Sequence, residues 1–314
     1  MPDPLHIREA GADEIDAVVA LAGQALGWDQ EAPNRALFEW KHRANPFGPT
    51  RLWVADDDGE LVGLRALMRW AFDRPDGRLV RAVRPVDTAT HPDHQGRGIF
   101  RRLTEHAVEA ERADGVGFVF NTPNDQSRPG YLKMGWQLAG RVRTYARPLH
   151  AAAPLRMARS RTPADKWSLP ATDGGDPVEL LTDDYVAHLE HPSENGLVTQ
   201  RSAPFLRWRY GLAELAYRVL DADDAAVIYR RRRRGPATEL VVADVLAVDT
   251  AAAADVIRRL GRLGDADYML AAGTRIPGTW PLPGQGPLLT TRHLAQPAPR
   301  LSDLSLRLGD LELF

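Results

Sequence analysis

The pattern of apolar and polar residues predicts strands and helices that alternate along the first half of the chain. Asp13 is placed to cap a helix that ends near Gly23, and a second helix begins near Pro33. Two more helical patterns follow, one after Gly98 and a short one around Tyr131. Apolar runs bounded by turn residues predict strands at residues 6–9, 52–55, 61–70, 79–90, 117–120 and 136–147. We therefore expect a mixed α/β sheet.

Pro85 interrupts the apolar strand predicted at residues 79–90. Proline has no N–H group for the hydrogen-bond ladder of a sheet, so within sheets it is confined to edges and bulges. We therefore expect this strand to bulge, or to leave its neighbour, at that point.

The second half of the chain repeats the order of elements found in the first. Residues 37–42 align with residues 205–210, and each segment is followed by a strand, an acidic turn, two more strands and a helix. Residues 149–176 are rich in alanine and proline, which is typical of a linker. The pattern predicts two domains, at residues 1–148 and 177–314, although chance similarity between two α/β units remains an alternative.

The amino-acid composition excludes several kinds of site and partner. With 44% hydrophobic and 26% charged residues, the 314-residue chain is typical of a globular protein. The net charge of −2 gives no indication of a nucleic-acid partner, and no apolar run is long enough to cross a membrane. The absence of cysteine excludes disulfides, thiolate ligands and a cysteine nucleophile, and fits a cytoplasmic protein. No His/Asp/Glu cluster has metal-ligand spacing, so we predict no metal.

Five consecutive arginines, at residues 230–234, form the most basic segment of the chain. A nucleic-acid site and a solvated hairpin turn are the two interpretations. Because few aromatic residues lie nearby and the chain as a whole is not basic, the pattern favours the solvated turn.

A glycine-containing loop links the strand at residues 79–90 to the helix after it. Its sequence is Gln95-Gly96-Arg97-Gly98-Ile99. Glycines allow close approach to the backbone, and a helix that begins here directs its free N–H groups into the loop. The segment therefore predicts an anion site, although neither the P-loop nor the dinucleotide-binding motif is complete.

This loop resembles the pyrophosphate-binding loop of the GNAT superfamily of acyl-CoA-dependent N-acetyltransferases, Gln/Arg-x-x-Gly-x-Gly/Ala. Phe100 stands where the final small residue is expected. Downstream, Asn124 to Ser127 and then Tyr131-Leu132-Lys133-Met134-Gly135-Trp136 are similar to a second segment of that family. The second half of the chain lacks both motifs and has residues 249–252 in place of the glycine loop. The resemblance therefore implies a GNAT fold followed by a degenerate GNAT-like domain.

The resemblance also implies a site for acetyl-CoA and a catalytic tyrosine. Tyr131 is expected to protonate the leaving thiolate, since a phenol keeps its proton at neutral pH. Asp87 is the first choice for the general base, with backbone hydrogen bonding at the strand end as the alternative; Glu39 and the carboxylate of Phe314 are weaker choices. The residues expected to bind coenzyme A are Ala89, Thr90, Gln95, Gly96, Arg97, Gly98, Ile99, Phe100, Arg101, Asn124, Ser127 and Tyr131.

The function implied is transfer of an acetyl or other acyl group from acetyl-CoA to a primary amine of a small molecule or peptide. The amine would attack directly in a ternary complex, at a site that the second domain helps to shape, with one coenzyme A per chain. A non-catalytic acyl-CoA sensor is the alternative. A tandem acyltransferase that catalyses in its second half is disfavoured, because the motifs lie in the first half. The acceptor, the acyl chain and the formation of a homodimer stay open.

Overall fold

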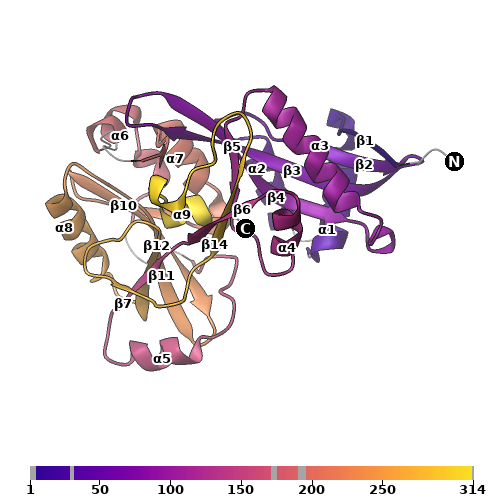
Figure 1. The fold of residues 1–314 in the computed structure, drawn as a ribbon. Helices are drawn as coiled ribbons and strands as arrows, with labels where there is room; N and C mark the ends of the chain where they lie inside the picture. Colours follow the sequence, from indigo (N-terminus) through magenta and orange to yellow (C-terminus); the bar gives the residue numbers. More distant parts are fainter. Residues whose placement is uncertain (1–4, 29–31, 171–174, 190–195, 313–314) are drawn as a thin grey trace. The chain divides into compact units, whose positions relative to one another are not determined.

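The computed structural model describes residues 5–28, 32–170, 175–189 and 196–312, which divide into two compact units (Figure 1). The first unit comprises Met1–Phe72, Leu79–Gly140 and Leu288–Leu301. The second comprises Asp73–Arg78, Arg141–Pro287 and Ser302–Phe314. Among the described residues, no helix combines the length and the apolar character needed to cross a bilayer.

The first unit is built on a mixed sheet in the order β1-β2-β3-β4-β5-β14-β6. Strands β4 and β5 are parallel, whereas β2 is antiparallel to both β1 and β3, and β14 is antiparallel to β5. The strands are β1 Leu5–Glu9, β2 Arg51–Asp57, β3 Glu60–Asp73, β4 Leu79–Thr90, β5 Phe118–Asn121, β6 Gln137–Arg141 and β14 Leu288–His293. The helices are α1 Ile15–Leu26, α2 Ala32–His42, α3 Ile99–Ala113 and α4 Arg128–Lys133.

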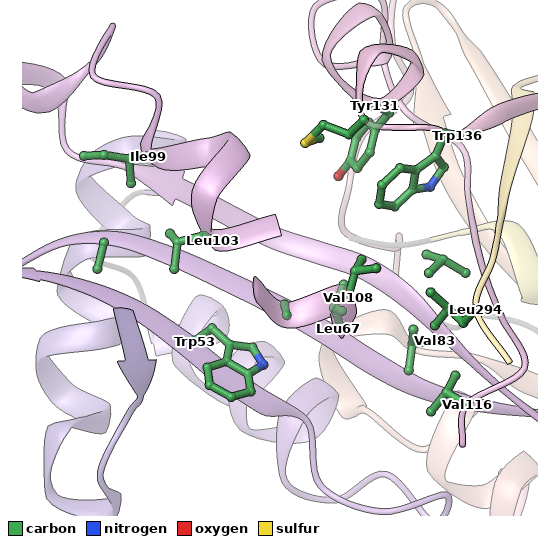
Figure 2. Packing of buried hydrophobic residues seen from close by; sticks show 14 of the residues in the cluster. Trp53, Leu67, Val83, Ile99, Leu103, Val108, Val116, Tyr131, Trp136 and Leu294 are labelled. Atoms are coloured by element: carbon green, nitrogen blue, oxygen red, sulfur yellow. The ribbon is translucent and has the colours of Figure 1, made fainter. Parts of the chain in front are cut away.

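Helix α3 supplies one side of the core of this unit. Ile99, Leu103 and Ala107 recur at helical spacing and are buried, as the amphipathic pattern predicts. They pack with residues of β2, β3, β4 and β5 in one apolar cluster, part of which Figure 2 shows from Trp53 to Leu294. Gly63 of β3 makes room for the helix, because a Cβ atom there would lie 2.6 Å from the Ile99 side chain.

The second unit is built on a six-stranded sheet in the order β13-β7-β12-β11-β10-β9. Its parallel pair is β11 and β12, with helix α8 between them in the chain, as α3 lies between β4 and β5. The strands are β7 Thr144–Pro148, β9 Arg218–Asp221, β10 Ala225–Arg234, β11 Ala237–Ala247, β12 Tyr268–Ala272 and β13 Trp280–Pro281; the short β8 is Val198–Thr199. The helices are α5 Ala153–Arg159, α6 Asp183–Leu189, α7 Ala203–Tyr210, α8 Thr250–Leu260 and α9 Leu308–Leu311.

The last predicted strand of the first half is wrong. In place of one strand at residues 136–147, the chain forms β6 and β7, which belong to different sheets. Strand β7 pairs with β12, and β14 from the far end of the chain pairs with β5. Gly140, inside β6, has a φ of 144°, a conformation that favours glycine, and β6 ends one residue later. The first compact unit includes the chain up to Gly140, apart from Asp73–Arg78, and resumes at Leu288, and the residues expected to form a linker contain α5.

The arginine run at residues 230–234 is not a solvated turn. These arginines end strand β10, and Arg230 is 1% exposed. Arg230 and Arg232 form ion pairs with Glu312 at 2.9 and 2.6 Å. Arg232 and Arg234 also pair with Glu239 of β11 at 2.7 and 2.5 Å. The prediction failed because Glu312 lies far away in the sequence.

Candidate active site

The parallel strands β4 and β5 separate partway along β4. Their pairing reaches Val83 opposite Val119, yet β4 continues to Thr90. Pro85 lies just past the last paired residue, which agrees with the interruption expected from its missing N–H. Ala89 is buried and Thr90 is half-buried in the separated part of β4. The carboxyl ends of separated parallel strands, before a helix, are a common ligand site in α/β folds.

The glycine loop lies between this part of β4 and helix α3. Gly96 and Gly98 have φ values of 79° and 76°, in the left-handed region where a side chain is strained. Gly98 is the N-cap of α3 and supplies no capping side chain, so the first N–H groups of the helix are left for another acceptor. Nothing lies within 4 Å of a Cβ placed on either glycine. This open helix N-terminus fits the phosphates of coenzyme A.

The side chains of the predicted loop residues have different surroundings. Arg97 pairs with Asp57 at 2.6 Å, and Arg101 pairs with Glu105 at 2.8 Å. Ile99 is buried in the core, and Gln95 is exposed. The two arginines therefore already have carboxylate partners, and the backbone of the loop is the part that best fits an anion.

Tyr131 of α4 is buried, and Figure 2 shows it beside Trp136. The ring centroids of Tyr131 and Trp136 are 5.0 Å apart, and Phe100 packs edge-on against Tyr131 at 5.5 Å. Asn124 and Ser127 define the turn before α4, because the Asn124 Oδ1 accepts hydrogen bonds from the Ser127 N–H at 2.9 Å and its Oγ at 2.8 Å. The packing of Trp136 and Phe100 against its ring thus holds the Tyr131 side chain in place.

The hydroxyl of Tyr131 accepts a hydrogen bond from Nη2 of Arg65 on β3, at 2.9 Å. Arg65 is 0% exposed, and its Nη1 donates to the hydroxyl of Thr88 on β4. The guanidinium lies 5.2 Å from the centroid of the Tyr131 ring. Within the described part of the chain, no carboxylate forms an ion pair with Arg65 and its Nε has no hydrogen-bond partner. Burial of a guanidinium without a counter-charge lowers the stability of the fold. Such a group is therefore a candidate for a functional role.

Sequence reasoning missed Arg65 and Thr88. The available signal was Arg65, in the middle of the apolar strand at residues 61–70, where charged side chains are unusual; Arg69 is the second arginine of that strand. Its partner Tyr131 lies 66 residues further along the chain, so only the folded sheet brings the two together.

Asp87 has surroundings that argue against the base role. Its carboxylate lies 2.8 Å from Nζ of Lys41 and 2.7 Å from Nε2 of His42, both on α2. Burial opposes ionisation of Asp87, but Lys41 and His42 outweigh it and hold the pKa of this carboxyl well below its usual range. A carboxylate with so low a pKa accepts protons poorly at neutral pH. The structure assigns Asp87 a part in fixing β4 to α2.

The other base candidates remain predictions. Glu39 forms an exposed ion pair with Arg35 at 3.1 Å. Phe314 lies outside the described residues.

Comparison with known proteins gives one family match. Residues 6–139 match the model of a family described as an acetyltransferase (GNAT) domain. The matched residues include both motifs, from Gln95 to Trp136. No curated protein matches the chain.

Solved structures extend the likeness over both units. A probable N-acyltransferase from Enterococcus faecalis V583 is similar with a TM-score of 0.68 and 14% identity, over 93% of this chain and 73% of that one. A GCN5-related N-acetyltransferase from Anabaena variabilis gives a TM-score of 0.65 at 11% identity, over 92% and 73%. Eis1 from Mycobacterium abscessus is similar with a TM-score of 0.60 and 18% identity, over 92% of this chain and 73% of that one. At these identities the likeness is one of fold, and it confirms the predicted two-half architecture.

Proposed function

We propose that this chain, whose residues 6–139 match the model of an acetyltransferase (GNAT) domain, transfers an acetyl or other acyl group from coenzyme A to a primary amine. The acceptor would be a small molecule or a peptide. The observation that carries the proposal is the Tyr131 hydroxyl, held by Arg65 at 2.9 Å, in the same unit as the open N-terminus of α3.

The residues proposed to bind coenzyme A lie in the first unit. The N–H groups at Gly98 and the start of α3 would bind the pyrophosphate. The separated part of β4, at Ala89 and Thr90, would form backbone hydrogen bonds with the pantetheine amides, much as a neighbouring strand would. Asn124 and Phe100 would border the path to Tyr131. When bound, acyl-CoA supplies an activated thioester carbonyl.

The chemistry requires one proton to leave the amine and one to reach the departing sulfur. The neutral amine forms a bond to the carbonyl carbon, and the bond from that carbon to sulfur breaks. Tyr131 gives its hydroxyl proton to the sulfur and becomes a phenolate. The phenolate regains a proton through solvent from the attacking nitrogen, so that the products are a neutral amide and a free thiol. Proton transfer of this kind typically contributes about 10²- to 10⁴-fold to the rate.

Arg65 acts on Tyr131 as a positioning residue. Because its Nη2 donates to the hydroxyl oxygen, the hydroxyl proton is left to point elsewhere, toward an acceptor. A guanidinium at 2.9 Å also stabilises the negative charge that the oxygen carries after proton transfer.

A sensor that binds acyl-CoA without turnover is the second candidate. It needs the glycine loop but no proton donor. The fixed hydroxyl of Tyr131 favours the enzyme, since a purely structural tyrosine has no need of a buried guanidinium.

An assay of acetyl-CoA turnover with a panel of primary amines tests the proposal. The rate is measured as the release of the free thiol of coenzyme A. We expect Tyr131→Phe to keep the affinity for coenzyme A and to lower kcat by about 10²-fold or more. Calorimetry measures the affinity separately. Normal coenzyme A binding with no turnover on any amine would favour the sensor, whereas an unchanged kcat in Tyr131→Phe would exclude Tyr131 as the acid.

A further inference from the structure

The second unit contains a cavity of about 600 Å³ that the proposed reaction does not use. All of its lining residues belong to that unit. It lies where β11 leaves β12: the pairing of these parallel strands ends at Val241 opposite Leu270, and the lining begins at Val242 and Ala271. The carboxyl ends of separated parallel strands are a preferred ligand site in α/β sheets. A volume of this size suits a small molecule.

The elements around the cavity are arranged like β4, the glycine loop and α3 of the first unit, with one difference in chemistry. Helix α8 follows β11 as α3 follows β4, but Asp249 caps α8 in place of the glycines. The Asp249 carboxylate accepts a hydrogen bond from the N–H of Ala252 at 2.8 Å. A phosphate at this helix end would meet a negative charge and would find that N–H occupied. The cavity is therefore unsuited to the pyrophosphate of coenzyme A.

The buried charge at the cavity wall is already balanced. Asp244 contacts Arg307 at 2.5 Å and Arg201 at 2.9 Å, and it accepts a hydrogen bond from the Tyr210 hydroxyl at 2.9 Å. These groups need no ligand to neutralise them. Most of the other walls are apolar and are formed by residues such as Val242, Val245, Ala253, Ala271, Ile276 and Leu308.

Arg275 is the charged lining residue that lacks a carboxylate partner among the described residues. Its side chain is exposed, and its Nε donates only to the carbonyl of Thr279 at 3.3 Å. The Nη groups are thus left to form the two parallel hydrogen bonds that guanidinium makes with a carboxylate.

We propose that this cavity binds a small carboxylic acid with an apolar body. The acyl or hydrocarbon part lies against the apolar walls, and the carboxylate meets Arg275. The carboxylate of the ligand, with one negative charge, pairs with Arg275. A phosphate at the N-terminus of α8 is repelled by the carboxylate of Asp249. This site is independent of the proposed acyltransferase activity.

Octanoate binding to the full-length protein, measured by calorimetry with coenzyme A present at saturation, tests the proposal. We expect one octanoate per chain. Ala253→Trp fills the cavity and abolishes binding, whereas Ala251→Trp, an exposed position of the same helix outside the lining, retains it. Arg275→Gln weakens octanoate binding by about tenfold or more and leaves the binding of 1-octanol unchanged.

Three results would overturn the proposal: no octanoate binding at millimolar concentration, equal binding by Ala253→Trp, or an equal effect of Arg275→Gln on the acid and the alcohol. Displacement of octanoate by coenzyme A would also overturn it, because the acid would then bind at the proposed coenzyme A site of the first unit. The exposed Arg275 variant keeps the test valid if Ala253→Trp does not fold.

Discussion

At the scale of single residues, the candidate active site depends on where charges are buried. Arg65 lies on β3 and Asp87 lies on the separated part of β4, and both side chains are buried. Asp87 is neutralised by Lys41 and His42, whereas Arg65 has only hydroxyl partners among the described residues. The first arrangement stabilises the fold, and the second leaves a positive charge available at the Tyr131 hydroxyl.

Replacement of Arg65 by Gln should reduce catalysis through Tyr131. We expect kcat to fall by about tenfold or more, because the phenolate loses a charge-assisted hydrogen bond. In the Tyr131→Phe background the same replacement should have little further effect, since both changes remove one function. Steady-state kinetics of the four proteins measure this coupling.

A second measurement separates positioning from a merely structural role. Arg65→Lys keeps a positive charge near the Tyr131 hydroxyl, so we expect it to restore kcat in part relative to Arg65→Gln. Calorimetry should show the same affinity for coenzyme A in both variants. Additive losses in kcat, or equal losses in Arg65→Lys and Arg65→Gln, would contradict the role of Arg65.

Gly98 should tolerate no side chain if coenzyme A binds at the start of α3. Gly98→Val places a β-branched residue at a φ of 76° and next to the N–H groups that would bind phosphate. We expect calorimetry to show a loss of coenzyme A affinity of at least about tenfold, with the fold preserved by circular dichroism. Gly59→Val, at another exposed turn glycine of this unit with positive φ, is the matched control for backbone strain. Equal affinity in Gly98→Val would remove the loop from the site.

At the scale of elements, the carboxylate of Glu312 links the segment after α9 to strand β10. Glu312 pairs with Arg230 and Arg232 and accepts a hydrogen bond from the Tyr217 hydroxyl at 2.7 Å. Burial opposes its ionisation, but the two guanidinium groups outweigh burial and lower the pKa of Glu312 to about 2. The ion pairs therefore fix the C-terminal segment onto β10.

Replacement of Glu312 by Gln should destabilise the second unit by about 3 kcal/mol or more, because the buried guanidinium of Arg230 loses the counter-charge of Glu312. Urea unfolding followed by tryptophan fluorescence measures the change at pH 7. Glu179→Gln, at an exposed position of the same unit, is the control.

The lowered pKa of Glu312 predicts how the stability of the second unit changes with pH. Its pKa is lower in the folded state than the value near 4.3 of an unfolded chain, so its stabilisation is present above that value. The stabilisation is lost as the pH falls toward about 2. The difference between wild type and Glu312→Gln should shrink over this range, and a constant difference would rule out Glu312 as its source.

At the scale of the whole molecule, the exchange of strands makes the two halves depend on each other's sequence. Strand β14, from residues 288–293, lies between β5 and β6 in the first sheet, and β7, from residues 144–148, lies in the second. Neither sheet is complete in a chain that is cut near the middle.

A chain that ends at residue 150 should therefore fail as an independent acyltransferase domain. Without β14, the strand β5 has an open hydrogen-bonding edge in the middle of an apolar core, which favours aggregation. We expect no cooperative unfolding transition and no coenzyme A binding by this fragment, whereas the full chain binds one equivalent. A soluble fragment that binds coenzyme A normally would show that β14 is dispensable.

The sequence by itself determined the local features of this protein. Most strands and helices of the first half, the glycine loop and the order of its two motifs follow from periodicity, turn residues and backbone freedom. All of these are set by neighbours within a few residues. The repeat in the second half was also visible, because it concerns the order of such local elements.

Only the tertiary structure decided which distant groups meet. The contacts of Arg65 with Tyr131, of Asp87 with Lys41 and of Arg230 with Glu312 each join residues more than 40 positions apart. The exchange of β7 and β14 has the same origin, since a strand's own residues set its apolar pattern but not its partner. Whether a charged residue acts as a base, an anchor or a positioning group depends on such partners, because they set its burial and its pKa.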